Sequence, residues 1–225
     1  MNSVPAKRTR PADVLADLRA AILGGSLSPG TPLRQDKLAA SLGVSKIPVR
    51  EALLRLVAEG LVSVETNRGF AVARLEPGEA KEILDIRAVL ECRAIFLAVP
   101  VMSEATIAEA AEILTEAERT SSIDRWGELN WAFHALLYEP ADRPRLANFI
   151  RQISNQTECY IRVLISNSNY RSVAEREHRT ILAACTLRNG EAASALLGQH
   201  IRQTGDLIAR FLDEQAARKA ALPDQ

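Results

Sequence analysis

Several residue types that mark common protein classes are scarce in this sequence. Its 225 residues include only three cysteines, an odd number, and the aromatic share is 4%. Because small secreted domains rely on paired cysteines, this composition argues against a disulfide framework and favours free thiols at Cys92, Cys159 and Cys185. Apolar runs fall short of the roughly 20 residues that a membrane-spanning helix needs, and the opening MNSVPAKRTR lacks the apolar core of a signal peptide. We therefore expect a cytoplasmic protein with no membrane contact.

Charge is balanced over the whole chain but not along it. The sequence holds 28 basic and 28 acidic residues. Residues 1–75 carry eleven of the basic residues and six of the acidic ones, a net charge of +5, which leaves residues 76–225 with 17 and 22, a net charge of −5. A basic front and an acidic back are expected when only the front meets phosphate groups. The length also suits two domains of ordinary size.

Two short helical patterns joined by a glycine lie in the basic part. Apolar residues recur three and four apart over residues 35–42, and Gly43 then ends that helix because glycine adopts left-handed backbone angles easily. Ser45 is a natural N-cap for a second helix over residues 45–59, whose first turn tolerates Pro48. Two helices joined by a tight glycine turn predict a helix-turn-helix.

The second of these helices has two distinct faces. Its apolar residues form an inward stripe, whereas Lys46 and Arg50 are four apart and share another face, directed outward toward a groove. Two β-prone runs follow over residues 61–66 and 70–73, separated by the turn-forming trio Asn67-Arg68-Gly69. They predict a small β-hairpin, or wing. A helical packing unit that never touches DNA has similar geometry, and the local basic charge favours the DNA-binding alternative.

Strand signals fade after this hairpin, and the rest of the chain shows helical periodicity. Six principal helices are predicted, over residues 78–98, 103–119, 123–138, 144–166, 172–188 and 191–218. Apolar residues at helical spacing in the first of them predict a bundle core that includes Ile83, Ile86, Val89, Leu90 and Ala94. We expect a mainly α protein with a winged helix-turn-helix over residues 1–75, a linker over 76–80 and an all-helical antiparallel bundle over 81–225.

The chain has three histidines, and all of them fall in the helical part. Asn130 and His134 are four apart and therefore project from one helix face. His178 lies 12 residues before Gly190 and His200 lies 10 after it, which places them roughly 18 and 15 Å from the turn between two helices. The two side chains are expected to face each other across that hairpin. Spacing alone leaves open both ordinary half-buried histidines and a metal site.

The stretch PGTPLRQDKLAASLGVSKIPVREALLRLVAEGLVSV resembles the winged helix-turn-helix of the GntR family of bacterial transcription regulators. SKIPVREAL followed by LVAEGLV and a glycine-bearing wing is that family's order of motifs, and a helix over residues 12–23 would support it. The helical part resembles the ligand-sensing FCD domain of the FadR branch, in its shorter six-helix form. The resemblance implies a sequence-specific regulator, most often a repressor, that binds a roughly palindromic operator as a homodimer.

The resemblance also implies which residues meet DNA. Lys46 stands where many relatives have arginine, so it offers a point charge without the arginine fork that grips guanine. The phosphate and base contacts implied around the recognition helix are Arg34, Ser45, Lys46 and Arg50. The wing-tip contacts implied with the minor groove or the backbone are Asn67, Arg68 and Gly69.

In many FCD domains an aspartate, a histidine four residues later and one histidine on each of two later helices bind a divalent metal. Here the resemblance assigns those places to Asn130, His134, His178 and His200, with asparagine replacing the aspartate. An amide oxygen still ligates but adds no negative charge. Three imidazoles suit Zn²⁺ or Ni²⁺ and leave open coordination positions.

An open cation in a helical cavity is a receptor for a small carboxylate, the effector expected here. Arg87 and Glu91 look like paired positions of the family on the first helix of the bundle, and Arg87 is a candidate to hold the anion. An i,i+4 ion pair that only supports the helix is the alternative. Arg151 and Tyr160 on the fourth predicted helix are further candidates for the effector pocket.

Two other classes of function fit parts of the sequence. A metal-dependent hydrolase could use three histidines, but the sequence has no His-Glu-x-x-His motif, and the pair Glu177-His178 has the reverse order. A metal-free helical adaptor would explain the bundle but leave the basic winged segment without a task. We therefore expect a regulator rather than an enzyme.

Overall fold

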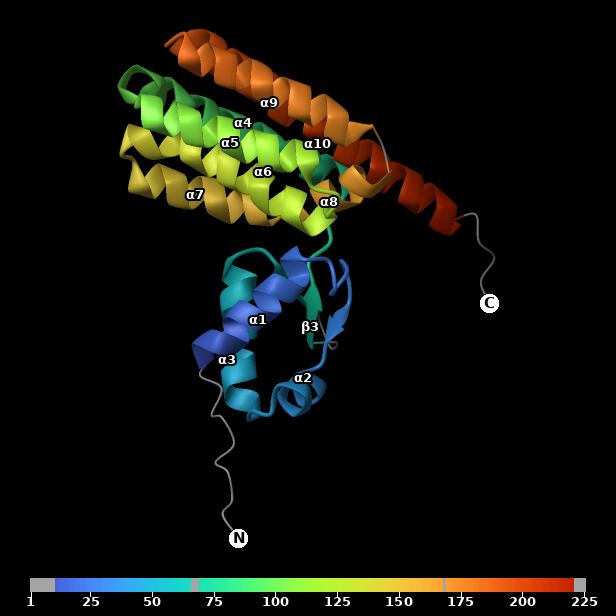
Figure 1. Ribbon diagram of the computed structural model, residues 1–225. Helices are drawn as coiled ribbons and strands as arrows, with labels where there is room; N and C mark the ends of the chain where they lie inside the picture. Colours follow the sequence, from blue (N-terminus) through green and yellow to red (C-terminus); the bar gives the residue numbers. More distant parts are fainter. Residues whose placement is uncertain (1–10, 66–68, 168, 221–225) are drawn as a thin grey trace. The chain divides into compact units, whose positions relative to one another are not determined.

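A computed structural model describes residues 11–65, 69–167 and 169–220 (Figure 1). The chain divides into two compact units, Met1–Arg74 and Leu75–Gln225. Most of the described residues are helical, and their strands all belong to the first unit, which confirms the predicted mainly α fold. Within the described ranges, no helix is long and apolar enough to cross a membrane.

The described part of the first unit consists of helices packed on a small sheet. In chain order its elements are α1 (Pro11–Leu23), β1 (Pro32–Leu33), α2 (Gln35–Leu42), α3 (Lys46–Ala58), β2 (Val62–Glu65) and β3 (Gly69–Val72). Val14 of α1 packs in one core with Val49, Leu53 and Leu56 of α3, and all four side chains are fully buried. This burial confirms the inward stripe predicted for the second helix of the helix-turn-helix.

The turn between α2 and α3 has the expected backbone geometry. Gly43 has φ 66° and ψ 32°, the left-handed conformation that glycine adopts most easily. Ser45 occupies the N-cap position of α3 with an extended backbone, but its side chain makes no capping hydrogen bond within the described residues. The predicted position of the cap is confirmed, whereas its hydrogen bond is not formed, so the first N–H groups of α3 are left to other partners.

The sheet contains one strand that the sequence pattern did not indicate. Its strand order is β1-β3-β2 with both pairs antiparallel, and β2 and β3 form the predicted hairpin, in which Glu65 lies opposite Gly69. β1 escaped prediction because two residues, one of them proline, show no alternation of polar and apolar side chains. Gly69 has φ 83°, while the wing-tip candidates Asn67 and Arg68 lie outside the described residues.

The second unit is a bundle of helices that lie alongside one another (Figure 1). Its α-helices are α4 (Pro77–Ala98), α5 (Glu104–Arg119), α6 (Ile123–Tyr138), α7 (Pro144–Asn155), α8 (Glu158–Asn167), α9 (Tyr170–Thr186) and α10 (Gly190–Ala220). Single turns of 3-10 helix follow α4 and α6, where Pro100 and Pro140 were expected to stop the helices. The long helices α4 and α10 pack against each other, and apolar side chains from every helix enter one core.

The single helix predicted over residues 144–166 is wrong, because the chain breaks into α7 and α8. At the break the backbone N–H and the hydroxyl of Thr157 both donate to the carbonyl oxygen of Ser154, at 3.1 Å each. Threonine side chains compete with helical hydrogen bonds in this way. Thr157 is fully buried, so the break brings a polar side chain into the interior of the bundle.

The linker expected over residues 76–80 is also wrong for most of its length, since α4 begins at Pro77. Glu76 is the N-cap of that helix, and a capping box with Glu79 satisfies N–H groups at its start. Proline belongs naturally in a first turn, because its missing N–H would have had no partner within the helix. The connection between β3 and α4 is therefore only residues 73–76.

The buried face of α4 agrees with the predicted one only in part. Ile83 and Ala94 are buried as expected, but Ile86 and Val89 are 43% and 69% exposed. Arg87 and Glu91 are buried on the same face as Ile83. Charged side chains enter a core only when they are paired and hydrogen-bonded, a condition that the ion pair between these two residues meets.

Candidate metal centre and nucleic-acid surface

Three helices bring the histidines of the second unit into one buried cluster. His134 comes from α6, His178 from α9 and His200 from α10, and none is more than 4% exposed. The Nε2 atom of His178 lies 3.3 Å from the Nε2 atom of His134 and 3.3 Å from that of His200. One potential ligand atom from each residue lies within 4.8 Å of the others. The contact between His178 and His200 confirms their predicted facing across the helical hairpin.

The other ring nitrogens of two of these histidines are held by acidic networks. The Nδ1 atom of His200 lies 2.6 Å from a carboxylate oxygen of Glu177. The Nδ1 atom of His134 lies 3.0 Å from the hydroxyl oxygen of Tyr138, and that hydroxyl donates its own proton to Glu91. Both Nδ1 atoms therefore act as donors, which leaves the Nε2 lone pairs directed at the centre of the cluster.

This arrangement concentrates lone pairs at one point. Burial lowers the pKa of His134, an effect that the nearby Glu91 carboxylate only partly offsets, and burial lowers the pKa of His178 well below its usual value. Neutral imidazoles are the form that binds a metal. A single Nε2–H on His178 can donate to only one of its two neighbours at a time, so one Nε2 lone pair is left without a donor. A bound cation would satisfy that lone pair.

Asn130, close to His134 in the sequence, offers an oxygen as a fourth possible donor beside the three nitrogens. It lies one helical turn before His134, on the same face of α6, and is 9% exposed. Its Oδ1 atom is buried without a hydrogen-bond partner among the described residues, which is rare for a buried amide. Three neutral imidazoles and an unpaired amide oxygen fit a divalent cation of intermediate softness such as Zn²⁺ or Ni²⁺.

Arg87 and Glu91 form a buried ion pair that joins this cluster. The Nε atom of Arg87 donates to Glu91 at 2.8 Å, and its Nη1 atom donates to Thr157 at 3.4 Å. Burial opposes ionisation of Glu91, but Arg87 and the donors His134 and Tyr138 outweigh it and hold its pKa at about 2. The i,i+4 ion pair is therefore present, and its Glu91 carboxylate also lies 3.5 Å from the Nδ1 atom of His134.

The two remaining effector candidates lie in different surroundings. Arg151 is exposed on α7, where its guanidinium lies over the ring of Trp131, 5.5 Å from the ring centre, so it does not enter the buried interior of the bundle. Tyr160 is buried, and its hydroxyl accepts a hydrogen bond of 2.9 Å from the backbone N–H of Leu75.

A surface hollow of about 260 Å³ leads to the edge of the histidine cluster. It lies between α9 and α10, and both His200 and its partner Glu177 line it. The other lining residues are Val173, Arg176, Thr180, Leu196 and Gln199. The Glu177 carboxylate thus stands where the buried cluster meets solvent. Sequence analysis missed Glu177 and Tyr138 as partners, although Tyr138 lies four residues after His134 and so shares its helix face.

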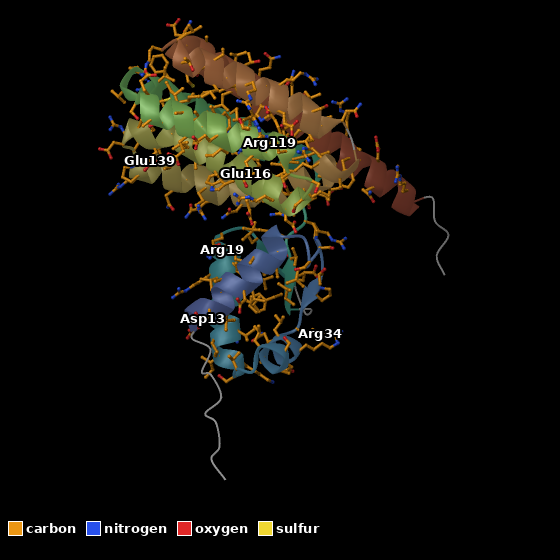
Figure 2. The ribbon with its side chains drawn as sticks, in the orientation of Figure 1. Asp13, Arg19, Arg34, Glu116, Arg119 and Glu139 are labelled. Atoms are coloured by element: carbon orange, nitrogen blue, oxygen red, sulfur yellow. The ribbon has the colours of Figure 1, made fainter. Side chains whose placement is uncertain are left out.

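In the first unit the candidate DNA contacts lie at the surface. Arg34, Ser45, Lys46 and Arg50 are all exposed. A hollow of about 330 Å³ brings Arg34, Lys46 and Gly69 together from three elements. Figure 2 shows the side chain of Arg34, the residue just before α2, extending away from the ribbon.

Two residues at this surface were absent from the sequence-based candidates. Asp36, which lines the same hollow, makes an ion pair with Lys46, and both side chains are largely exposed. Ile47 lies next to Lys46 in the first turn of α3 and is 70% exposed. The surface therefore combines cations with one acid and one apolar side chain.

Comparison with known proteins agrees with both units. Residues 11–72 match the family model described as bacterial regulatory proteins of the gntR family, and residues 82–203 match the FCD domain. The chain is 31% identical over 193 residues to the HTH-type transcriptional regulator McbR of Escherichia coli, covering 83% of this chain and 87% of that protein. It is 26% identical over 205 residues to the E. coli repressor RspR, covering 88% and 89%. A solved structure of E. coli McbR/YncC superposes with a TM-score of 0.77 at 28% identity, over 89% of this chain and 97% of that one.

Proposed function

Because the chain belongs to the GntR family of bacterial regulators and carries an FCD domain, we propose that it is a repressor controlled by a carboxylate bound at a divalent metal. The first half of that description, a DNA-binding transcriptional regulator and not an enzyme, follows from the family itself. The metal, the effector and the direction of control are the proposal. The observation that supports the metal site is the convergence of three buried histidine Nε2 atoms.

DNA recognition is assigned to the exposed start of α3 and its surroundings. We assign phosphate or base contacts to Arg34, Ser45, Lys46 and Arg50, and a backbone contact to the wing at Gly69. Helix N-termini favour anions, and lysine and arginine release counterions when they meet phosphates. A homodimer on a twofold-symmetric operator would place one α3 in each half-site.

The metal would be held by His134, His178 and His200, with the amide oxygen of Asn130 as the fourth protein donor. When bound, a divalent cation supplies a Lewis-acidic centre with open positions that attract an anion. Glu177 and the Tyr138–Glu91 pair orient two of the imidazoles through their Nδ1 atoms. Such outer partners typically change metal affinity by 10- to 100-fold when they are removed.

We propose that the effector is a small carboxylate, because the donor set adds no charge of its own to offset the cation. Arg87 is already neutralised by Glu91, so the pair is assigned to the wall of the effector site rather than to a free anion clamp. An effector changes operator affinity only if it binds two arrangements of the protein unequally. Relief of repression by the acid is the direction expected of such a regulator.

The DNA half of the proposal is tested by selecting bound duplexes from a random pool and then titrating the selected site at fixed salt. Arg50→Ala should lower affinity by about 5- to 150-fold, since a good base contact is worth about 1–3 kcal/mol. Arg55→Ala, an exposed arginine near the other end of α3, is the matched control and should change affinity little. Full affinity in Arg50→Ala would refute the assignment of α3.

The metal half is tested on the whole chain by elemental analysis and by thermal unfolding with Zn²⁺ or Ni²⁺ added. A metal at a free concentration of 100 times its dissociation constant stabilises the folded state by about 2.7 kcal/mol. We expect this stabilisation in the natural protein and its loss in His178→Ala. Candidate carboxylates are then added to the operator titration, with and without metal. The metal is excluded if the purified protein contains none and neither cation raises the unfolding temperature.

A further inference from the structure

Ile47 is an exposed apolar side chain that lies outside the apolar core formed by the described residues of the first unit. Ile47 is 70% exposed, although isoleucine is among the residues most often buried in proteins. The core of the unit takes Val49, Leu53 and Leu56 from the same helix, α3. Ile47 lies on the opposite side of the helix, so its apolar side chain adds nothing to the burial that stabilises this core.

The surroundings of Ile47 suit a polyanion and not an apolar protein partner. Exposed cations stand directly before it at Lys46 and three residues after it at Arg50, and Ser45 next to them is exposed and polar. The N-terminus of α3 carries the partial positive charge of the helix dipole, and no acidic residue in its first turn offsets that charge. A single apolar side chain framed by charge is too small for a protein docking patch, which needs a contiguous apolar area.

Within DNA, the major groove carries one apolar group on its base edges, the C5-methyl group of thymine. A helix that enters the groove by its N-terminal turn brings the first exposed side chains of that turn to the base edges. Ile47 and Arg50 are three residues apart and therefore neighbours on one face of α3. Ile47 offers an apolar contact and Arg50 a cationic hydrogen-bond donor, so the two side chains suit different base edges.

We infer that Ile47 is a specificity-determining residue that contacts a thymine methyl group in each operator half-site. The inference rests on the proposed entry of α3 into the major groove, and it names one base that this helix contacts. Arg50 beside it provides the polar or phosphate contact, so the half-site is expected to place a thymine within one or two steps of the Arg50 contact. Lys46, held by Asp36, contributes charge on the other flank.

The test removes only the methyl group. Each thymine of the selected operator is replaced in turn by uracil, and dissociation constants are measured at fixed salt for the natural protein, Ile47→Ala and Leu54→Ala. Burying one methyl-sized group is worth about 0.8 kcal/mol, so uracil at one symmetric pair of positions should weaken binding about fourfold per half-site. In Ile47→Ala the same replacement should have no effect.

Leu54 is the matched control because it is also an exposed apolar residue of α3, at 48%, but lies about two turns further along the helix. Leu54→Ala should keep the full response to uracil. The inference is refuted if the natural protein binds every uracil-substituted operator as tightly as the unsubstituted one. It is also refuted if uracil still weakens binding of Ile47→Ala. Failure to select any duplex would instead refute α3 as the DNA-binding helix, and both proposals would fall together.

Discussion

Breaking the Arg87–Glu91 ion pair should destabilise the second unit more than the loss of any exposed charge pair on α4. In Arg87→Met the side chain keeps its apolar stem, and Glu91 is left fully buried without its cation. Removing one partner of a buried pair typically costs 3–5 kcal/mol. We expect the lower end, about 3 kcal/mol, because Tyr138 and His134 still hydrogen-bond or contact the Glu91 carboxylate.

Urea unfolding followed by tryptophan fluorescence measures this cost in the right part of the chain. Both tryptophans of the sequence, Trp126 and Trp131, belong to α6 of the bundle. Lys81→Met is the matched control, since it breaks the 3.0 Å pair between Lys81 on α4 and Asp206 on α10, both more than half exposed. Exposed pairs contribute about 0–1 kcal/mol, so the control should unfold at nearly the natural urea concentration.

A double variant separates the charge from the packing. Arg87→Met combined with Glu91→Leu removes both charges, and replacing a buried pair with apolar residues of similar size is often neutral or stabilising. It should therefore be more stable than Arg87→Met alone. The reasoning fails if Arg87→Met is as mild as the Lys81 control, or if the double variant is less stable than the single one.

Three further outcomes are expected from single substitutions. Asp36→Asn should strengthen binding to all duplexes by severalfold and steepen the salt dependence, because it frees Lys46 for phosphate; a titration series in salt measures both, and unchanged affinity would contradict the ion pair's role. Asn130→Asp should tighten Zn²⁺ binding by about tenfold or more, since it adds a negative charge to a neutral donor set; competition with a colorimetric chelator measures it, and weaker binding would remove residue 130 from the site. Glu177→Gln should weaken metal binding by about 10- to 100-fold while leaving the apo unfolding temperature nearly unchanged, and Glu214→Gln, exposed on α10, is its control.

Local patterns were sufficient to predict most helices and the meeting of the histidines. The heights of His178 and His200 follow from a fixed rise per residue on either side of one turn, so two numbers from the sequence placed them opposite each other. The helix-turn-helix was equally accessible, because Gly43 and the apolar stripe of α3 act within a few residues. Such features depend on short stretches whose geometry is nearly independent of the rest of the chain.

The errors arose where a distant contact decides the local structure. Ile86 and Val89 were expected in the core but are exposed, whereas Arg87 is buried and donates to Thr157, which lies 70 residues further along the chain. The break at Thr157 was hidden for the same reason, since no glycine or proline marks it. Glu177 could not be assigned to His200 without knowing which helix faces meet, whereas the spacing of Tyr138 and His134 on one helix was a signal in the sequence.

The proposed input and output of the protein are linked most directly through α4. Only the four residues 73–76 separate the end of β3 from the start of this helix, so the chain leaves the wing strand and enters the bundle almost at once. Midway along α4, Glu91 accepts the proton of Tyr138, whose hydroxyl oxygen meets the Nδ1 atom of His134. A cation held by the three histidines would therefore lie at one end of a hydrogen-bond chain whose other end is on α4. Glu91, at that other end, is also fixed by its buried ion pair with Arg87.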